Sequence, residues 1–390
     1  MSGRIYLDWN ATAPLRPEAR AALLDALDAA GNPSSVHAEG RRARQIIEEA
    51  RESVAALVGA DPRNVIFTSG GTEANALALT PEIADGDDRR PRDALLISAV
   101  EHASVRAGGR YRPGAIRELP VHLTGRLDLE ALRAAVAPLG DAGTGFLVSL
   151  MHANNETGVI QPVREAAEIV HAAGGLLHVD AVQSAGKIGC DIGALGADLL
   201  SLSAHKIGGP KGVGALIKAR EALHVAPLLA GGGQERGARG GTENVAGIAA
   251  FGAAAAAAQR ELDGFAGLAA ERNALEQRLM ALHRDAVIFG ASQPRLPNTT
   301  LFAVPGIKAE TALIALDLDG VAVSSGSACS SGKVAASHVL RAMRVPADLA
   351  AGAIRVSTGF ATSRADIGTF LAAWENRMAK LSKERSGLAA

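Results

Sequence analysis

The sequence contains few cysteines: only two of its 390 residues, Cys190 and Cys329. Two cysteines cannot build the disulfide framework on which small secreted domains depend. The spacings C-x-x-C and H-E-x-x-H are absent and the histidines are dispersed, so we expect no metal site. These absences favour a globular protein of a reducing compartment, and we expect it in the cytoplasm.

Neither an excess of charge nor a long apolar run is present. Forty Lys and Arg residues balance forty-one Asp and Glu residues, which leaves a formal net charge of −1. That balance gives no basic surface for nucleic acid or anionic lipid. The apolar runs stop well short of the roughly 20 residues that a membrane span needs. The N-terminal MSGRIYLDWN has no apolar core of a signal peptide. We therefore expect neither a nucleic-acid nor a membrane partner.

What the chain has instead is an alternation of apolar strand-like stretches with helical periodicity. The expected strands lie near residues 65, 95, 147, 177, 199 and 214, with helices between several of them. This rhythm predicts an α/β fold with a mostly parallel sheet flanked by helices. Apolar periodicity predicts helices over 18–30, 37–57, 163–173 and, with a break near Gly264, over about 242–282.

The composition changes near residue 263, where shorter strand-like stretches begin. We expect strands over 287–289, 298–304 and 321–323. This change predicts a second, smaller α+β domain that begins at about residue 263.

Polar side chains follow the ends of the expected strands. In parallel sheets, ligands bind beyond the carboxyl ends of the strands. Each of these residues alone fits an ordinary role in a turn or a cap, but together they indicate one site. They are Thr72, His102, Asn155, Asp180, Gln183 and Lys206.

Lys206 follows a buried strand and precedes a glycine-rich stretch, in SAHKIGGPKG. In a desolvated pocket its neutral amine would be favoured, and neutral amines condense with carbonyls. Lys206 is therefore a candidate Schiff-base lysine for pyridoxal 5'-phosphate (PLP). A solvated lysine in a glycine turn fits the same residues.

The stretch SGGTEAN is a second candidate, because a glycine turn there feeds a helix that opens at Thr72. Free N–H groups and the helix dipole favour an anion at such a point. An ordinary strand-to-helix turn would look the same. Asp180 could pair with a pyridinium nitrogen or cap a helix, and His102 could stack on a planar ring or lie exposed in a turn.

The stretch SSGSACSSG surrounds Cys329 with serine and glycine, although free thiols are usually buried. An accessible thiol suits a nucleophile that receives sulfur, and it also suits a plain surface turn. Cys190 fits a structural position better. In AIRVSTG, Arg355 is a candidate partner for a substrate carboxylate or a member of a surface ion pair.

Taken together, these stretches resemble the NifS/IscS-type cysteine desulfurases of the class-V aminotransferase group. The resemblance extends from Tyr6 to about Phe370. The shared motifs, in chain order, are SGGTEAN, EHASV, HANNETG, HVDAVQS, SAHKIGGPKG, GGGQERGARGGTEN, SSGSACSSG and AIRVSTG.

The resemblance implies a PLP fold-type-I homodimer with a large cofactor domain, 14–262, and a small domain built from 1–13 and 263–390. Lys206 would hold PLP and His102 would stack on its ring and transfer protons. Asp180 would pair with the ring nitrogen, and Arg355 would bind the carboxylate of cysteine. Asn155 and Gln183 would lie near the phenolic oxygen of PLP. The phosphate would be held by Gly71, Thr72, Ser203, His205 and the partner subunit's Thr242.

The implied activity converts L-cysteine to L-alanine and leaves the sulfur as a persulfide on Cys329, for iron–sulfur cluster assembly or another sulfur-transfer pathway. A sulfur-acceptor or iron–sulfur scaffold protein would be the partner. Another PLP enzyme of this fold, a selenocysteine lyase or a transaminase, is the alternative. A transaminase would have no need of Cys329. A catalytically idle sulfur carrier is disfavoured because Lys206, Asp180 and His102 are all present.

Overall fold

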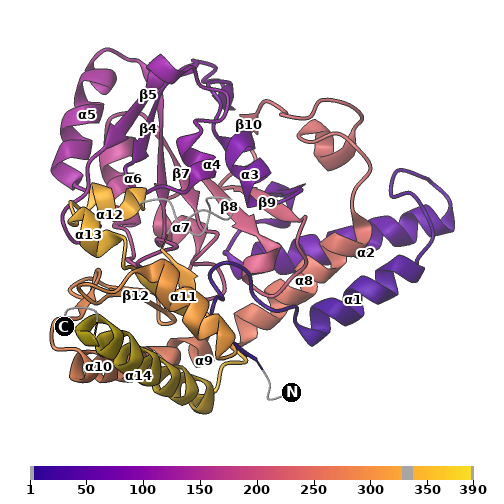
Figure 1. Cartoon of the computed structure of the whole chain (residues 1–390). Helices are drawn as coiled ribbons and strands as arrows, with labels where there is room; N and C mark the ends of the chain where they lie inside the picture. Colours follow the sequence, from indigo (N-terminus) through magenta and orange to yellow (C-terminus); the bar gives the residue numbers. More distant parts are fainter. Residues whose placement is uncertain (1–3, 327–336, 388–390) are drawn as a thin grey trace.

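A seven-stranded sheet forms the centre of the larger part of the protein (Figure 1), in a computed structural model that describes residues 4–326 and 337–387. The strand order is β2-β9-β8-β7-β6-β4-β5. The strand β9 alone runs opposite to the other six strands. The predicted α/β fold with a mostly parallel sheet is confirmed. The strands are β2 (Val65–Thr68), β4 (Arg92–Ser98), β5 (Ile116–Leu119), β6 (Gly145–Met151), β7 (Leu176–Asp180), β8 (Leu199–Ser203) and β9 (Gly214–Lys218).

Both faces of this sheet are buried, which explains why its strands are continuous apolar runs instead of alternating ones. Successive residues still point to opposite faces: Leu96 and Val148 belong to one core cluster, Leu95 and Leu147 to another. Helices cover the two faces. They are α2 (Ala38–Leu57), α3 (Gly71–Ala78), α4 (Ala103–Arg106), α5 (Leu129–Asp141), α6 (Val163–Ala172), α7 (Ile192–Leu195) and α8 (Val245–Arg260).

The helix expected over 242–282 is three helices in the structure: α8, α9 (Leu262–Ala266) and α10 (Leu268–Leu282). The break lies at Glu261 and again at Gly267, close to the predicted position. The alanine-rich α8 packs against α2 and α1 (Pro17–Asp28), and the three lie side by side in Figure 1. Small side chains allow this close approach.

The second half of the chain adds a four-stranded antiparallel sheet of order β11-β12-β15-β14. The aromatic residues Phe302, Phe370 and Trp374 are buried in the core beside it. Its strands are β11 (Val287–Ile288), β12 (Thr299–Ala303), β14 (Ser324–Ser325) and β15 (Ile354–Ser357). Its helices are α10, α11 (Ala309–Leu318), α12 (His338–Ala342), α13 (Ala347–Ala350) and α14 (Arg364–Gly387).

The N-terminal segment crosses to this second sheet region. Its strand β1 (Ile5–Tyr6) pairs in parallel with β13 (Val321–Ala322), and Asp8 forms a bridge with Ser357. A small antiparallel pair, β3 (Ile83–Asp85) with β10 (Leu223–Val225), completes the strands of the described residues. Among the helices that the structure describes, none is both long and apolar enough to cross a membrane.

Candidate active site

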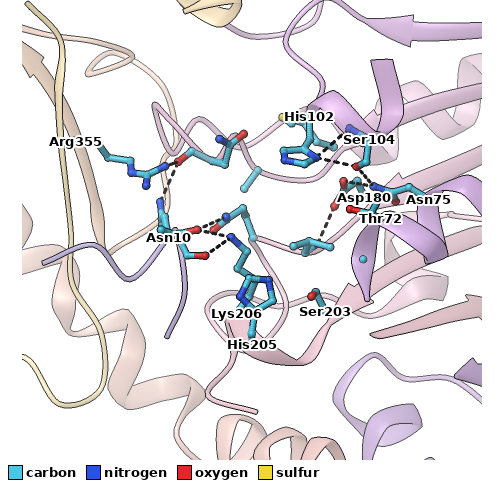
Figure 2. A pocket seen from close by; sticks show the side chains of 17 residues that line it. Asn10, Thr72, Asn75, His102, Ser104, Asp180, Ser203, His205, Lys206 and Arg355 are labelled. Carbon is cyan, nitrogen blue, oxygen red and sulfur yellow. Dashed lines mark hydrogen bonds between the residues drawn. The ribbon is translucent and has the colours of Figure 1, made fainter. Parts of the chain in front are cut away.

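A cavity of about 290 Å³ lies beyond the carboxyl ends of the parallel strands (Figure 2). The four-stranded sheet closes one side of the cavity through the side chain of Arg355 in β15. Ten of the residues singled out in the sequence line this cavity: Gly71, Thr72, His102, Asn155, Asp180, Gln183, Ser203, His205, Lys206 and Arg355.

Lys206 stands on the short 3-10 helix η3 (Ala204–Lys206), which follows β8 directly. Its Nζ donates to the backbone carbonyls of Asn10 and Ala11, at 2.5 and 2.9 Å. These carbonyls belong to the N-terminal segment, as Figure 2 shows. The lysine is therefore held by backbone oxygens on the cavity wall, and its position is not that of a solvated turn lysine.

Asp180, the last residue of β7, is a buried carboxylate with two separate partners. Its Oδ1 accepts from the backbone N–H of Val182 at 3.0 Å. Its Oδ2 accepts from Nδ2 of Asn75 at 2.8 Å. The hydrogen bond from Val182 resembles a helix cap, which the sequence analysis gave as the alternative role of Asp180. These two hydrogen bonds fix the orientation of the Asp180 carboxyl group on the cavity wall.

His102 caps the N-terminus of α4, where its Nδ1 accepts from the backbone N–H of Ser104 at 3.2 Å. The neutral ring therefore carries its proton on Nε2. The Ser104 hydroxyl lies 2.8 Å from Nδ1 and accepts from Asn75 Nδ2 at 2.9 Å. Asn75 thus connects the imidazole to Asp180, and the two groups are held in a fixed relation on the cavity wall (Figure 2).

The N-terminus of α3 opens onto the cavity at Gly71 and Thr72, next to Ser203 and His205. A Cβ at Gly71 would come within 3.2 Å of the Cβ of Ser203 and 2.9 Å of the Val182 side chain, so a larger residue there would require these neighbours to shift. Burial, and then the nearby Lys206, lower the pKa of His205 to about 4. His205 is therefore a neutral ring at pH 7. Backbone N–H groups and hydroxyls at a helix N-terminus suit a phosphate.

Arg355 reaches the cavity from β15 and is buried. One terminal nitrogen donates to the carbonyl of Asn155 at 2.8 Å, and the other to Asp8 Oδ1 at 2.7 Å. The ion pair foreseen as an alternative does exist, but it is buried instead of lying on a surface. Its Nε has no hydrogen-bond partner within the described part of the chain. A guanidinium on the cavity wall suits a substrate carboxylate.

Two predicted residues are not among those that line the cavity. Thr242 is exposed, between η4 (Gln234–Gly237) and α8, so within its own subunit it contributes no lining. Cys329 lies outside the described residues. Cys190 is buried, and burial raises the pKa of its thiol to about 12, which fits the expected structural role.

Three polar residues that the sequence did not single out also line the cavity: Asn10, Asn75 and Ser104. Asn75 and Ser104 belong to the motifs SGGTEAN and EHASV, each within three residues of a predicted residue. One turn of helix places Asn75 beside Thr72 on the cavity side. Asn10 lies in an N-terminal stretch that reaches the cavity only in the folded protein, so no local pattern in the sequence indicates its role.

The cavity is lined by the amine of Lys206, the carboxyl group of Asp180, the imidazole of His102 and the guanidinium of Arg355. The N-terminus of α3 adds a site that suits an anion. These are the groups that PLP and an amino-acid substrate require, so the residues fit that cofactor.

Comparison with known protein families agrees with this interpretation of the cavity. The sequence profile described as aminotransferase class-V matches residues 5–370. The chain therefore belongs to the class-V aminotransferase family.

Within that family its relatives are cysteine desulfurases. One from Cereibacter sphaeroides is 44% identical, with 94% of each chain covered. One named cysteine desulfurase IscS, from Dictyoglomus turgidum, is 40% identical, covering 98% of this chain and 96% of the relative. The resemblance to NifS/IscS-type enzymes is thereby confirmed.

Solved structures agree. A NifS-like protein from Rickettsia africae superposes with a TM-score of 0.85 at 36% identity, over 96% of this chain and 99% of that one. A structure described as SspA in complex with cysteine has a TM-score of 0.75 at 26% identity and covers 90% and 98%.

Proposed function

We propose that this protein is a PLP-dependent cysteine desulfurase that converts L-cysteine to L-alanine and receives the sulfur on Cys329. One observation carries the proposal: Lys206, Asp180 and Arg355 line a single cavity, although they come from separate elements. An amine, a carboxylate and a guanidinium are groups that the cofactor and an α-amino acid need. The identities of 40–44% with enzymes of this name support the substrate.

The cofactor would be held by residues that already converge on the cavity. Gly71, Thr72, Ser203 and His205 would hold its phosphate, and Asp180 its ring nitrogen. His102 would lie against the ring, with Asn155 and Gln183 near its phenolic oxygen. Lys206 would anchor PLP at this site, and the cofactor would supply an electron sink that makes the α-proton of the substrate acidic.

The protein's own residues would then divide the work. Arg355 binds the substrate carboxylate and so fixes the orientation of the α-carbon. Lys206 removes the α-proton, and His102 transfers protons beside it. The Cys329 thiolate attacks the substrate sulfur: an S–S bond forms while the Cβ–S bond breaks. The overall change is L-cysteine plus Cys329–SH to L-alanine plus Cys329–S–SH, in which all atoms balance.

We propose further that the enzyme is a cytoplasmic homodimer. Thr242 is exposed and absent from its own subunit's lining, which suits a contribution to the phosphate site of a second copy. The persulfide would pass to a sulfur acceptor or an iron–sulfur scaffold protein.

The test is to incubate the purified protein with PLP, L-cysteine and a thiol reductant, then to measure sulfide and alanine. We expect equal amounts of both. Lys206→Ala should abolish both products and Cys329→Ala should abolish sulfide release, whereas the control Cys190→Ala should retain activity. Alanine without sulfide in the unmodified protein, or sulfide that survives Cys329→Ala, would contradict the assignment.

A further inference from the structure

A second lysine is buried next to the cavity and has no role in the proposed chemistry. Lys187 is 4% exposed and lies in the turns that follow β7. Its Nζ donates to Oε1 of Gln183 at 3.0 Å and to Oδ1 of Asn10 at 3.1 Å. Within residues 4–326 and 337–377 no carboxylate forms an ion pair with it. A buried ammonium without a counter-charge is costly, so this arrangement requires an explanation.

The hydrogen-bond pattern fits a neutral amine. A neutral amine has two N–H donors, and the structure supplies two amide oxygens as acceptors. Burial lowers the pKa of Lys187 well below its usual range, and the nearby Lys206 and Arg355 lower it further. Lys187 therefore acts as a double hydrogen-bond donor and not as a fixed charge.

Lys187 and the Asn10 carbonyl together fix which way the Gln183 carboxamide faces. Because Oε1 accepts from Lys187, Nε2 is directed to the Asn10 carbonyl, to which it donates at 2.9 Å. The same carbonyl accepts from Lys206 Nζ at 2.5 Å. If Lys187 were removed, Oε1 of Gln183 and Oδ1 of Asn10 would each lose a hydrogen bond, and the carboxamide would keep only its bond to the Asn10 carbonyl.

Further hydrogen bonds hold the side chain of Asn10 in place. Its Oδ1 also accepts from Asn298, and its Nδ2 donates to Thr299 at 2.9 Å. Lys187 is thus one of the contacts that fix the Asn10 carbonyl beside Lys206.

We propose that Lys187 is a positioning residue for the cofactor site: its amine keeps the N–H side of Gln183 available to the cavity and the Asn10 carbonyl beside Lys206. The inference rests on the proposed function, because it takes PLP as the ligand. It adds a role for a residue that touches neither the cavity nor the substrate.

The experiment measures the dissociation constant of PLP and the absorbance maximum of the bound cofactor in Lys187→Met. Methionine keeps the volume and removes both donors. We expect PLP binding weaker by about tenfold, as for one or two lost buried hydrogen bonds, and a shifted absorbance maximum. The control is Lys218→Met, because Lys218 also donates to two oxygens, the carbonyls of Glu221 and Leu223, but lies away from the cavity. It should bind PLP as the unmodified protein does.

A double-mutant cycle separates positioning from a general structural effect. If Lys187 acts in part through Gln183, Lys187→Met should weaken PLP binding less in a Gln183→Ala background than in the unmodified protein. A second variant, Lys187→Gln, retains a neutral donor and should bind PLP more tightly than Lys187→Met; it also serves if the methionine variant does not fold.

Unchanged binding and absorbance in Lys187→Met, or losses that multiply in the double variant, would overturn the inference. If the unmodified protein fails to bind PLP, the proposed function fails instead, so the two failures are distinguishable.

Discussion

At the scale of single residues, Glu156 is a buried acid one residue beyond the cavity-lining Asn155. Its Oε2 accepts from the Ser337 hydroxyl at 2.5 Å. Burial raises the pKa of Glu156 to about 7, while the bond from Ser337 and the nearby Arg355 and His102 oppose that shift. Near neutral pH this carboxyl is therefore partly protonated in the folded protein.

This raised pKa predicts how stability depends on pH. Between the usual pKa of 4.5 and about 7, the native state binds more protons than the unfolded state. The contribution of this group to the free energy of unfolding therefore falls as pH rises through that window and is lost above it. Glu156→Gln stays neutral, so relative to the unmodified protein it should gain about 2.5 kcal/mol between pH 5 and pH 8.

Urea unfolding of both proteins at the two pH values measures this difference. Glu52→Gln, on an exposed part of α2, is the control and should show no such gain. A constant difference between Glu156→Gln and the unmodified protein would mean that the carboxyl is not protonated in the native state.

At the scale of elements, the contact between α2 and α8 depends on a glycine. A Cβ added at Gly252 of α8 would lie 2.5 Å from the Cα of Ala50 in α2. Backbone atoms cannot yield as a flexible side chain does, so the two helices would have to separate. By contrast, Gly264 in α9 has open space where a Cβ would be.

These two glycines form a matched pair for a test of packing. Gly252→Ala should lower the free energy of unfolding by about 1–3 kcal/mol through overpacking. Gly264→Ala should leave it unchanged or raise it by up to about 1 kcal/mol, because alanine favours the helix. Thermal or urea unfolding measures both. Equal effects of the two substitutions would show that helix propensity outweighs the contact.

At the scale of the whole molecule, the cavity is assembled from distant parts of one chain. Asn10 comes from the N-terminal segment, Asp180 from β7, Lys206 from η3 directly after β8, and Arg355 from β15. The same N-terminal segment pairs with β13. The site therefore forms only when both ends of the chain are in place, and the division into domains 14–262 and 1–13 with 263–390 stays a prediction.

The proposed homodimer predicts complementation between two inactive or weakened variants. In a mixed dimer of Lys206→Ala and Thr242→Ala subunits, one site keeps its own Lys206 and receives an intact Thr242 from its neighbour. Such a dimer, purified through two different tags, should show about half the desulfurase activity of the unmodified dimer. If Thr242 served its own subunit, the mixed dimer would retain only half the activity of the Thr242→Ala dimer.

Much of the fold could be predicted because local signals and tertiary structure agree. Strands such as β6 and β7 are apolar along their whole length, and a buried parallel strand requires this. The strand β5 (IREL) was not predicted, because it carries two charged residues and is only partly buried at the edge of the sheet. The break between α8 and α10 was expected as one interruption and is two.

The sequence by itself determined which residue types stand at the ends of the strands, and so the kind of cofactor they suit, because chain connectivity carries parallel strands to a common edge. Only the tertiary structure decided which side chains support them. Asn75 meets Asp180, and Lys187 meets Asn10, across separations of 105 and 177 residues. Hydrogen bonds over such separations depend on how the elements pack, and no local pattern in the sequence records them.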